Sequence, residues 1–484
     1  MDRNKILPII YVRGYAGSSG AVESTVDLPY YGFNLGSTKV RAGVDGEPGF
    51  SIFESPLIRL MKDYGYVDYF VRCDEGVLEL LREQPGDEYP FSSLWVYRYY
   101  DITSKIMGEG IRKEIEVLAQ NLGTVIDGVL EKTGAPQVYL VAHSMGGLIC
   151  RSLIQKFWRE QAVGKIAKLF TYGTPHNGIH FRKGLNWATV VRDAFGINDS
   201  DTFGLRRMKE YLDLSGEEAN SLEGRFPVER VFSMIGTNYQ DYDVAGGWSR
   251  RAVGPGSDGL VQVKNAYVKG SSRAYVYRSH SGPYGIVNSE EGYQNLQRFL
   301  FGDTSIQFDL VGVRITDSYP DRDTLRYLLL ETRVSIAGED ITMTGQLEEQ
   351  GSGTVVVPDE LAAGSETLFR TYLAKSQRAG SSRYSHLQIE IKIVPKHVRD
   401  RKIWRNRRYF GEYLFHKTLT IGVGDPDAQG RRKVRYAWSA LDADIEARPG
   451  RLLDDGTLDI PLKSHKSDFR WIKSGVLRIS VRQE

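Results

Sequence analysis

The order of apolar segments over the first three fifths of the chain constrains the fold more than any other feature. From about Lys5 to Gly302, short β-rich apolar runs alternate with stretches of helical periodicity. This alternation is typical of a mostly parallel, doubly wound sheet covered by helices on both faces, so the predicted fold class is α/β. The predicted strands span residues 6–12, 67–73, 94–99, 137–142, 167–172, 231–235 and 274–277.

Helical signals lie between these strands. Apolar residues recur at helical spacing from Ile111 to Leu130 and predict one long amphipathic helix. Ser55 followed by Pro56 predicts the start of a shorter helix, because a proline at the first helical position loses no hydrogen bond. A closing helix is predicted over residues 289–300.

The sequence pattern changes after Gly302. Segments such as IQFDLVGVRI, LQIEIKIV and GVLRISVR alternate apolar and polar residues, with almost no helical period. This pattern predicts an all-β, sandwich-like domain. The chain is therefore expected to divide into an α/β domain over residues 1–303 and a β-sandwich-like C-terminal domain over residues 304–484.

Charge and cysteine content narrow the class of protein. The formal net charge of +2 gives no reason to expect a nucleic-acid partner. Only Cys73 and Cys150 are present, which is typical of a reducing compartment. Pro8 and Arg13 interrupt the N-terminal apolar run, which therefore predicts a strand and not a signal peptide, and no apolar stretch is long enough to span a membrane. A cytoplasmic protein is expected, with export by a leaderless route as the alternative.

The stretch VYLVAHSMGGLI, residues 138–149, ends a predicted strand in a polar turn. A strand, then x-Ser-x-Gly-Gly, then a helix is the pattern of a nucleophile elbow, with Ser144 at its tip. Ala142 and Gly146 are small where the turn brings backbones together, and Gly147 lets the helix pack close to its strand. The helix directs its N-terminal N–H groups toward the serine oxygen. The alternative is a serine that only caps a helix.

A nucleophilic serine needs a base and an acid that orients the base. His280 is the candidate base, because it follows an apolar strand in the loop RSHSGPYG; the alternative is a solvated surface histidine. Asp258, in GPGSDGLVQV, is the candidate acid. Asp241 and Asp243 also follow a strand and are its rivals, and any of the three could be a turn former. His143 lies inside the turn itself and cannot swing round to its own neighbour.

Five motifs occur in a fixed order along the chain, namely YVRGYAG, AHSMGG, YGTPHNG, SDGLV and RSHSG. Through them, residues from about 5 to 302 resemble the α/β-hydrolase superfamily, and within it the lipases and serine esterases. The resemblance implies a catalytic first domain with Ser144 as nucleophile, His280 as general base and Asp258 as the orienting acid.

The same resemblance implies an oxyanion hole made of two backbone N–H groups. These belong to Tyr15, in the loop after the first strand, and to Met145, directly after the nucleophile. The chain departs from the family pattern at two positions: Arg13 replaces the usual histidine of the loop, and Ala142 replaces the first glycine of the elbow.

No metal or cofactor is expected. Ser281 and Gly282 stand where some relatives carry an acidic calcium ligand after the histidine. His176, in GTPHNG, is interpreted from the family as a structural or rim residue and is left out of the triad.

The connection from about 178 to 226 is much longer than a usual link between a strand and a helix. Its apolar residues predict helices that resemble a lipase lid, which would exclude water and offer apolar surface to an acyl chain. The alternative is that these faces pack on the domain. The first helix carries Phe181, Leu185, Trp187, Ala188, Val190, Val191 and Ala194, and the second Leu205, Met208, Tyr211 and Leu212. A second insertion, residues 22–54, is expected to line the same mouth.

A basic run, KHVRDRKIWRNRR, lies in the C-terminal domain around Trp404. Such a run suits peripheral contact with anionic lipid head groups, with a solvated hairpin as the alternative. The residues that would make the contact are Arg399, Arg401, Lys402, Arg405, Arg407 and Arg408.

The expected function is that of a serine carboxylic-ester hydrolase of the lipase type, acting on acyl esters or lipids through a Ser-His-Asp triad. A phospholipase, acyl thioesterase, amidase or acyltransferase on the same triad is the alternative, because the triad sets the chemistry while the pocket sets the leaving group. A non-catalytic binding protein on the same fold is the alternative from a different class.

Overall fold

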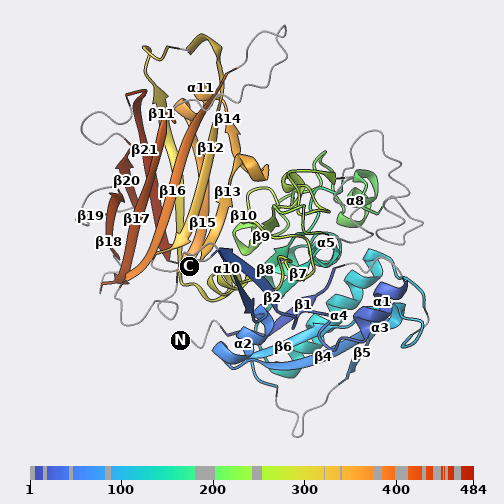
Figure 1. Ribbon diagram of the computed structural model, residues 1–484. Helices are drawn as coiled ribbons and strands as arrows, with labels where there is room; N and C mark the ends of the chain where they lie inside the picture. The colour runs from blue at the N-terminus through green and yellow to red at the C-terminus, as the bar shows by residue number, and fades with distance from the viewer. Residues whose placement is uncertain are drawn as a thin grey trace. The chain divides into compact units, whose positions relative to one another are not determined.

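A computed structural model of the 484-residue chain gives the architecture. It describes residues 6–14, 19–42, 47–81, 89–108, 110–179, 202–242, 253–320, 322–337, 341–373, 384–397, 413–427, 432–439, 448–450, 452, 456–462 and 470–483. The chain divides into two compact units, Met1–Leu300 and Phe301–Glu484, which are described separately below (Figure 1).

An 8-stranded sheet forms the centre of the first unit, in the order β10-β9-β8-β7-β1-β6-β4-β5 (Figure 1). All neighbouring strands are parallel except the pair β4 and β5. The strands are β1 (Ile9–Val12), β4 (Val67–Asp74), β5 (Val77–Leu80), β6 (Ser93–Tyr97), β7 (Val138–His143), β8 (Ile166–Tyr172), β9 (Val231–Gly236) and β10 (Ser272–Val276). The predicted α/β fold with a mostly parallel sheet is confirmed, and β5 is an edge strand that was not predicted.

Helices pack on this sheet in two groups. In the first group, α4 and α5 contact each other; α4 also contacts β4, and α5 contacts β7. α2 and α10 are joined by a hydrogen bond from the Tyr64 hydroxyl to Gln297 Oε1 (2.8 Å), and the Tyr139 hydroxyl of β7 donates to the carbonyl of Leu300 at the end of α10 (3.1 Å). The helices are α1 (Ser19–Val26), α2 (Pro56–Tyr64), α3 (Tyr100–Thr103), α4 (Ile115–Thr133), α5 (Met145–Ser152), α6 (Glu160–Lys165), α8 (Leu205–Leu212) and α10 (Glu290–Phe301).

The predicted helices that fall within the described residues are present, with one wrong boundary. α2 starts at Pro56 as expected, and the Ser55 hydroxyl accepts a hydrogen bond from the Ile58 N–H (3.2 Å). α5 continues as a π-helical turn over Leu153–Trp158. The long helix was predicted from Ile111, but it begins at Ile115; Ile111 precedes it and is 57% exposed, so its apolar side chain belongs to the connection and not to the buried face.

The insertion over residues 22–54 contains a hairpin that the sequence did not predict. β2 (Ser37–Ala42) pairs with β3 (Pro48–Phe53) in antiparallel fashion, apart from the main sheet.

The second unit is almost entirely β-structure, in two antiparallel sheets ordered β15-β11-β21-β20 and β13-β12-β16-β17-β18-β19, with β14 paired to β12. Buried and less buried residues alternate along β16 and β21, as expected of sheets with one face in a core. The predicted C-terminal all-β domain is confirmed. Its elements are β11 (Thr304–Ile315), β12 (Leu325–Ile336), β13 (Thr342–Gln346), β14 (Thr354–Val356), α11 (Pro358–Ala363), β15 (Ser365–Leu373), β16 (Tyr384–His397), β17 (Phe415–Pro426), β18 (Arg432–Ser439), β19 (Arg448–Gly450), β20 (Thr457–Pro461) and β21 (Ile472–Gln483).

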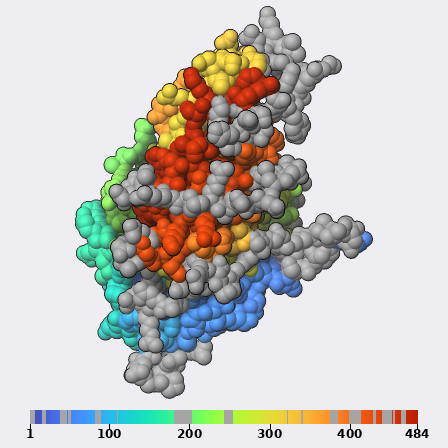
Figure 2. All heavy atoms as spheres, turned by 90° about the vertical axis from the view of Figure 1, so that its left-hand side faces the viewer, coloured from blue at the N-terminus to red at the C-terminus, as the bar shows by residue number. Residues whose placement is uncertain are grey.

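The last strands of this unit reach its surface. Figure 2 shows a face on which atoms late in the chain, coloured orange to red, predominate among those of described residues. The basic run singled out in the sequence spans residues 396–408; Lys396 and His397 end β16, and residues 398–408 lie outside the described residues.

Other predictions also fall outside the described ranges. Tyr15, Asp243 and the first predicted lid helix, within residues 180–201, belong to this group. The two cysteines are described: Cys73 and Cys150 are buried, unpaired thiols. In the described parts of the chain, no helix has both the length and the apolar character to cross a bilayer.

Candidate active site

Ser144 occupies a strained turn between β7 and α5. Its φ of 52° and ψ of −126° lie in a region that residues with a side chain rarely adopt. Its N–H donates to the Tyr172 carbonyl of the adjacent strand β8 (2.9 Å), and its carbonyl accepts from the Thr174 hydroxyl (2.8 Å). The turn is therefore held from both sides, and strain of this kind is typical of a functional position.

Three glycines allow the backbone to approach this turn. A Cβ at Gly14 would lie 2.5 Å from the Ser144 Cβ, and one at Gly146 would lie 2.3 Å from the Val12 carbonyl oxygen. A Cβ at Gly147 would lie 2.3 Å from Thr174 Oγ1. A side chain at any of the three would collide with these neighbours, so the small residues of the motif are required by packing.

His280 links the serine to an acid. Its Nε2 lies 3.0 Å from Ser144 Oγ, and its Nδ1 lies 2.7 Å from Asp258 Oδ2. All three side chains are almost inaccessible, with exposures of 5% for Ser144, 3% for His280 and 1% for Asp258. The structure thus brings together the three residues that the sequence selected, in the order serine, histidine, aspartate.

Asp258 is fixed by its own loop. Its Oδ1 accepts hydrogen bonds from the N–H groups of Leu260 (3.0 Å) and Val261 (2.7 Å), while its backbone carbonyl accepts from the His280 N–H (2.8 Å). Oδ2 is left to accept the Nδ1–H of His280. The other ring nitrogen, Nε2, is then unprotonated and can accept the proton of the Ser144 hydroxyl.

The rival acid Asp241 does not contact the histidine. Asp241 is exposed, and its Oδ2 accepts a hydrogen bond from the Asn238 side chain (2.5 Å). Asp243 lies outside the described residues.

His143 contacts the site in a way that the sequence did not indicate. Its ring lies against the His280 ring, with 4.9 Å between centroids, and its Nε2 is 3.0 Å from the His280 carbonyl oxygen. Desolvation, together with the charges of His280 and Arg13, holds the pKa of His143 well below 6.5, so the ring is neutral and its Nε2–H donates. The only signal in the sequence was its place at the end of a strand, beside the nucleophile.

His176 is buried, and its hydrogen bonds are not made to the triad residues. Its Nε2 lies 3.0 Å from Thr171 Oγ1, which itself donates to the Phe232 carbonyl (3.3 Å), so Nε2–H is the donor. Its Nδ1 is buried with no hydrogen-bond partner among the described residues. Burial, with the nearby charge of Arg151, holds the pKa of His176 well below 6.5, which suits a structural residue.

Because His143 and His176 are neutral in the folded chain, we expect the protein to lose stability in acid. Because their pKa values are depressed from 6.5 in the folded chain, the unfolded chain binds more protons once the pH falls below that value. The free energy of unfolding should then decrease as the pH falls from about 6.5, by up to about 1.4 kcal/mol per pH unit for each histidine. Urea unfolding between pH 7.5 and 5.5 measures the slope. His176→Gln should make the pH dependence of the free energy of unfolding shallower. An unchanged slope would contradict the depressed pKa of His176.

The oxyanion donors are only partly described. Met145 is the first residue of α5, where a backbone N–H has no acceptor within the helix and is free to bind an oxyanion. The second expected donor, the N–H of Tyr15, lies outside the described residues.

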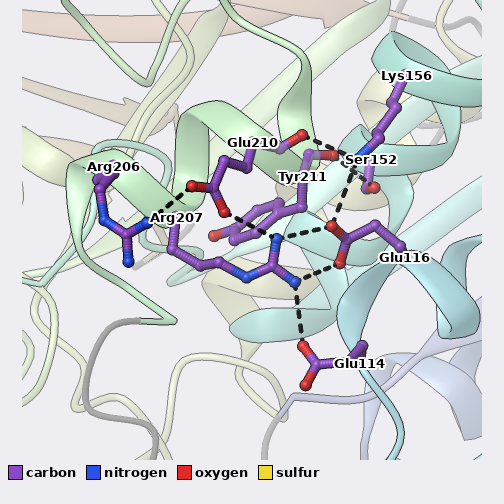
Figure 3. A network of polar contacts seen from close by, with 8 residues as sticks. All are labelled: Glu114, Glu116, Ser152, Lys156, Arg206, Arg207, Glu210 and Tyr211. Carbon is purple, nitrogen blue, oxygen red and sulfur yellow. Dashed lines mark hydrogen bonds and ion pairs between the residues drawn. The ribbon is translucent and has the colours of Figure 1, made fainter.

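The second predicted lid helix, α8, is packed on the domain. Its apolar residues Met208, Tyr211 and Leu212 are fully buried. Figure 3 shows Arg207 of α8 between two acids: its Nη1 and Nη2 lie 2.7 Å from the two carboxylate oxygens of Glu116, and Nη2 lies 3.1 Å from Glu114. Three of the four apolar residues predicted for this helix thus pack on the domain, while Leu205 is 42% exposed, and the role of a lid stays a prediction.

Arg207 should stabilise the packing of α8 on α4. We expect Arg207→Met to lower the free energy of unfolding by about 1–2 kcal/mol, since the change breaks a two-pronged and partly buried ion pair. Arg206→Met is the matched control. That side chain is 75% exposed and pairs with Glu210 one turn along the same helix, a contact worth about 0.5 kcal/mol or less. Equal effects of the two changes, measured by urea unfolding, would contradict the prediction.

Metal ligation has no support in the described ranges. There, no group of three or more histidine, cysteine, aspartate or glutamate side chains is arranged to hold a metal ion.

Comparisons with known proteins give remote structural likenesses. No family model and no curated protein matches the chain. A solved gene product from Listeria innocua is similar at 14% identity, over 61% of this chain and 94% of that one, with a TM-score of 0.31. A putative cell surface hydrolase from Lactobacillus plantarum WCFS1 is similar at 14% identity, over 60% and 88%, with a TM-score of 0.29. Phospholipase PlaB from Legionella pneumophila is similar at 11% identity, over 81% and 87%, with a TM-score of 0.37.

Proposed function

We propose that the protein is a serine carboxylic-ester hydrolase of the lipase type, with Ser144 as nucleophile, His280 as general base and Asp258 as the acid that orients the base. The observation that carries the proposal is the unbroken chain of contacts at the strained turn, 3.0 Å from Ser144 Oγ to His280 Nε2 and 2.7 Å from His280 Nδ1 to Asp258 Oδ2. The reaction belongs to an α/β domain over residues 1–303, with residues 304–484 as a β-sandwich-like appendage.

The geometry supports a two-step acyl transfer. Ser144 Oγ attacks the ester carbonyl while His280 Nε2 takes its proton, and Asp258 stabilises the imidazolium that forms. The N–H of Met145, joined by that of Tyr15, binds the oxyanion of the tetrahedral intermediate. His280 then gives its proton to the leaving alcohol, which departs. Water, activated by the same histidine, attacks the acyl-enzyme and releases the carboxylic acid.

The substrate is an acyl ester or lipid. A phospholipid, an acyl thioester or an amide would pass through the same acyl-enzyme, and transfer to an alcohol in place of water would make the protein an acyltransferase. These activities differ in the leaving group or the acceptor, so a panel of matched acyl substrates separates them.

The direct test of the proposal is labelling of Ser144. A neutral alkyl fluorophosphonate should modify the full-length protein at this residue, because only an activated serine attacks such a reagent at neutral pH. Peptide mass spectrometry locates the label. Absence of labelling under conditions that label a known serine esterase would overturn the proposal and favour a non-catalytic binding protein.

A further inference from the structure

Arg13 lies next to the nucleophile and is not used by the proposed reaction. It directly follows β1, and the next residue, Gly14, lies against the side chains of Ser144 and His143. Its Nη1 approaches Gly32, where a Cβ would lie only 2.9 Å away, so the glycine leaves room for the guanidinium. This is the carboxyl end of the parallel strands, where α/β sheets bind their ligands.

Three buried arginines of the first unit have acceptors for their guanidinium groups. Arg98 pairs with both carboxylate oxygens of Asp101 at 2.9 Å and donates to three backbone carbonyls. Arg151 donates to Gln155 Oε1 and to three backbone carbonyls. Arg278 pairs with Glu291 at 3.1 Å. Each pattern offsets the high cost of taking a guanidinium out of water.

Arg13 differs from these residues. Within the described part of the chain, no carboxylate pairs with its guanidinium and no side chain or carbonyl accepts a hydrogen bond from it. The side chain is partly buried, and desolvation lowers its pKa, yet an arginine stays charged at neutral pH. The guanidinium donors therefore lie near Gly32, and their charge also acts on His143, with no acceptor among the described residues.

The groups around Arg13 do not supply a negative charge. It interacts electrostatically with Tyr31, Tyr99 and Tyr100. The hydroxyls of Tyr31 and Tyr99 are committed elsewhere, to Asp101 Oδ1 (2.8 Å) and to the backbone carbonyl of Arg13 itself (2.8 Å). Burial raises the pKa of both phenols well above 10, so both stay neutral. The surrounding groups in the described chain therefore offer Arg13 no counter-charge.

We propose that Arg13 binds an anionic group of the substrate, a phosphate or a carboxylate, beside the ester that Ser144 attacks. This inference rests on the proposed ester hydrolysis and narrows its substrates to charged esters. The guanidinium is suited to this role, because its planar fork can donate two parallel hydrogen bonds to either oxyanion. It would also orient the substrate, since a second fixed point limits rotation of the bound ester.

The test compares pairs of esters that differ by one anionic group. 4-Nitrophenyl butyrate and 4-nitrophenyl hemisuccinate differ by a carboxylate on the acyl side. A monoacylglycerol and the corresponding acylglycerol phosphate differ by a phosphate on the alcohol side. We expect wild-type protein to favour the anionic member of one pair in kcat/KM. Arg13→Met should lower kcat/KM for that member by about 10- to 100-fold, largely through KM, and change the neutral member by less than about threefold.

Two further variants separate the effect of charge from that of the planar guanidinium and control for the loss of a surface charge. Arg13→Lys keeps the charge but loses the fork, so it should recover part of the loss seen in Arg13→Met. Arg206→Met removes one exposed charge from the same unit and should leave the ratio of anionic to neutral turnover unchanged. The pair in which the selective loss occurs identifies the anion as an acyl-side carboxylate or an alcohol-side phosphate.

Failure of this inference is distinguishable from failure of the proposed function. Wild-type protein that is labelled at Ser144 and shows no preference for the anionic member of either pair would overturn the role of Arg13 alone. Arg13→Met that is labelled normally and loses activity equally on charged and neutral members would do the same, and would make Arg13 a support of the loop. Protein that is neither labelled nor active on any ester would overturn both.

Discussion

Replacing Ser144 with alanine is expected to lower kcat for ester hydrolysis by about 10⁴- to 10⁶-fold, because no other group can form the acyl-enzyme. The residual rate would rest on substrate binding and on the oxyanion donors, which the change leaves in place. His280→Ala should be comparably damaging, since it removes the base that takes the proton of the serine. Initial rates on a short soluble ester, with circular dichroism to show an intact fold, measure both effects.

The matched control for this change is Ser152→Ala. Ser152 lies on the same helix α5, and its buried hydroxyl donates to the Tyr211 carbonyl (2.7 Å), as Figure 3 shows. Its loss should cost stability, about 1–2 kcal/mol, without a large change in kcat. Ser144→Ala protein that retains activity within about tenfold of wild type would show that the elbow serine is not the nucleophile.

The central sheet could be predicted because its strands are buried on both faces. Strands such as β7 and β9 read as continuous apolar runs bounded by turn residues, and such runs are visible in a sequence. β5 was missed because its four residues, VLEL, are too few to show the period of a strand. The start of α4 was misplaced because Ile111 continues the apolar spacing although its side chain is exposed.

The apolar spacing correctly predicted the helix α8, but it could not predict where the apolar face of that helix would pack. A stripe of Met208, Tyr211 and Leu212 is equally suited to a movable lid and to a fixed core position. The choice depends on partners distant in sequence, the acids Glu114 and Glu116 at the start of α4. Their approach to Arg207 follows from how the helices pack on the sheet, and no local pattern encodes it.

The candidate site could be predicted in its residue types and only partly in its contacts. Ser144 was found from a local signal, a strand that ends in small residues. The contact of His143 with the His280 carbonyl depends on the path of the loop after β10, which a sequence does not specify. Arg13 appeared in the sequence only as a departure from a motif. That it has no carboxylate partner among the described residues could be seen only in the structure.

The choice between the candidate acids leads to the second large prediction. Asp258→Asn is expected to lower kcat by about 10³- to 10⁴-fold, although the side chain keeps its shape. Two backbone N–H groups, of Leu260 and Val261, donate to Oδ1 and will hold the carbonyl oxygen of the asparagine at that position. The amide NH₂ must then face His280 Nδ1, where the carboxylate oxygen now lies at 2.7 Å.

A donor in that place reverses the role of the ring. Nδ1 must accept the hydrogen bond, so the proton of neutral His280 moves to Nε2, and Nε2 can no longer accept the proton of Ser144. Asp241→Asn is the matched control, because this exposed carboxylate contacts Asn238 and not the histidine, and kcat should stay within about twofold of wild type. Steady-state rates of the two variants at pH 7.5 decide the matter. A larger loss in Asp241→Asn than in Asp258→Asn would mean that the acid is misassigned, whereas the expected order would identify the loop at Asp258 as the one that sets the tautomer of the base.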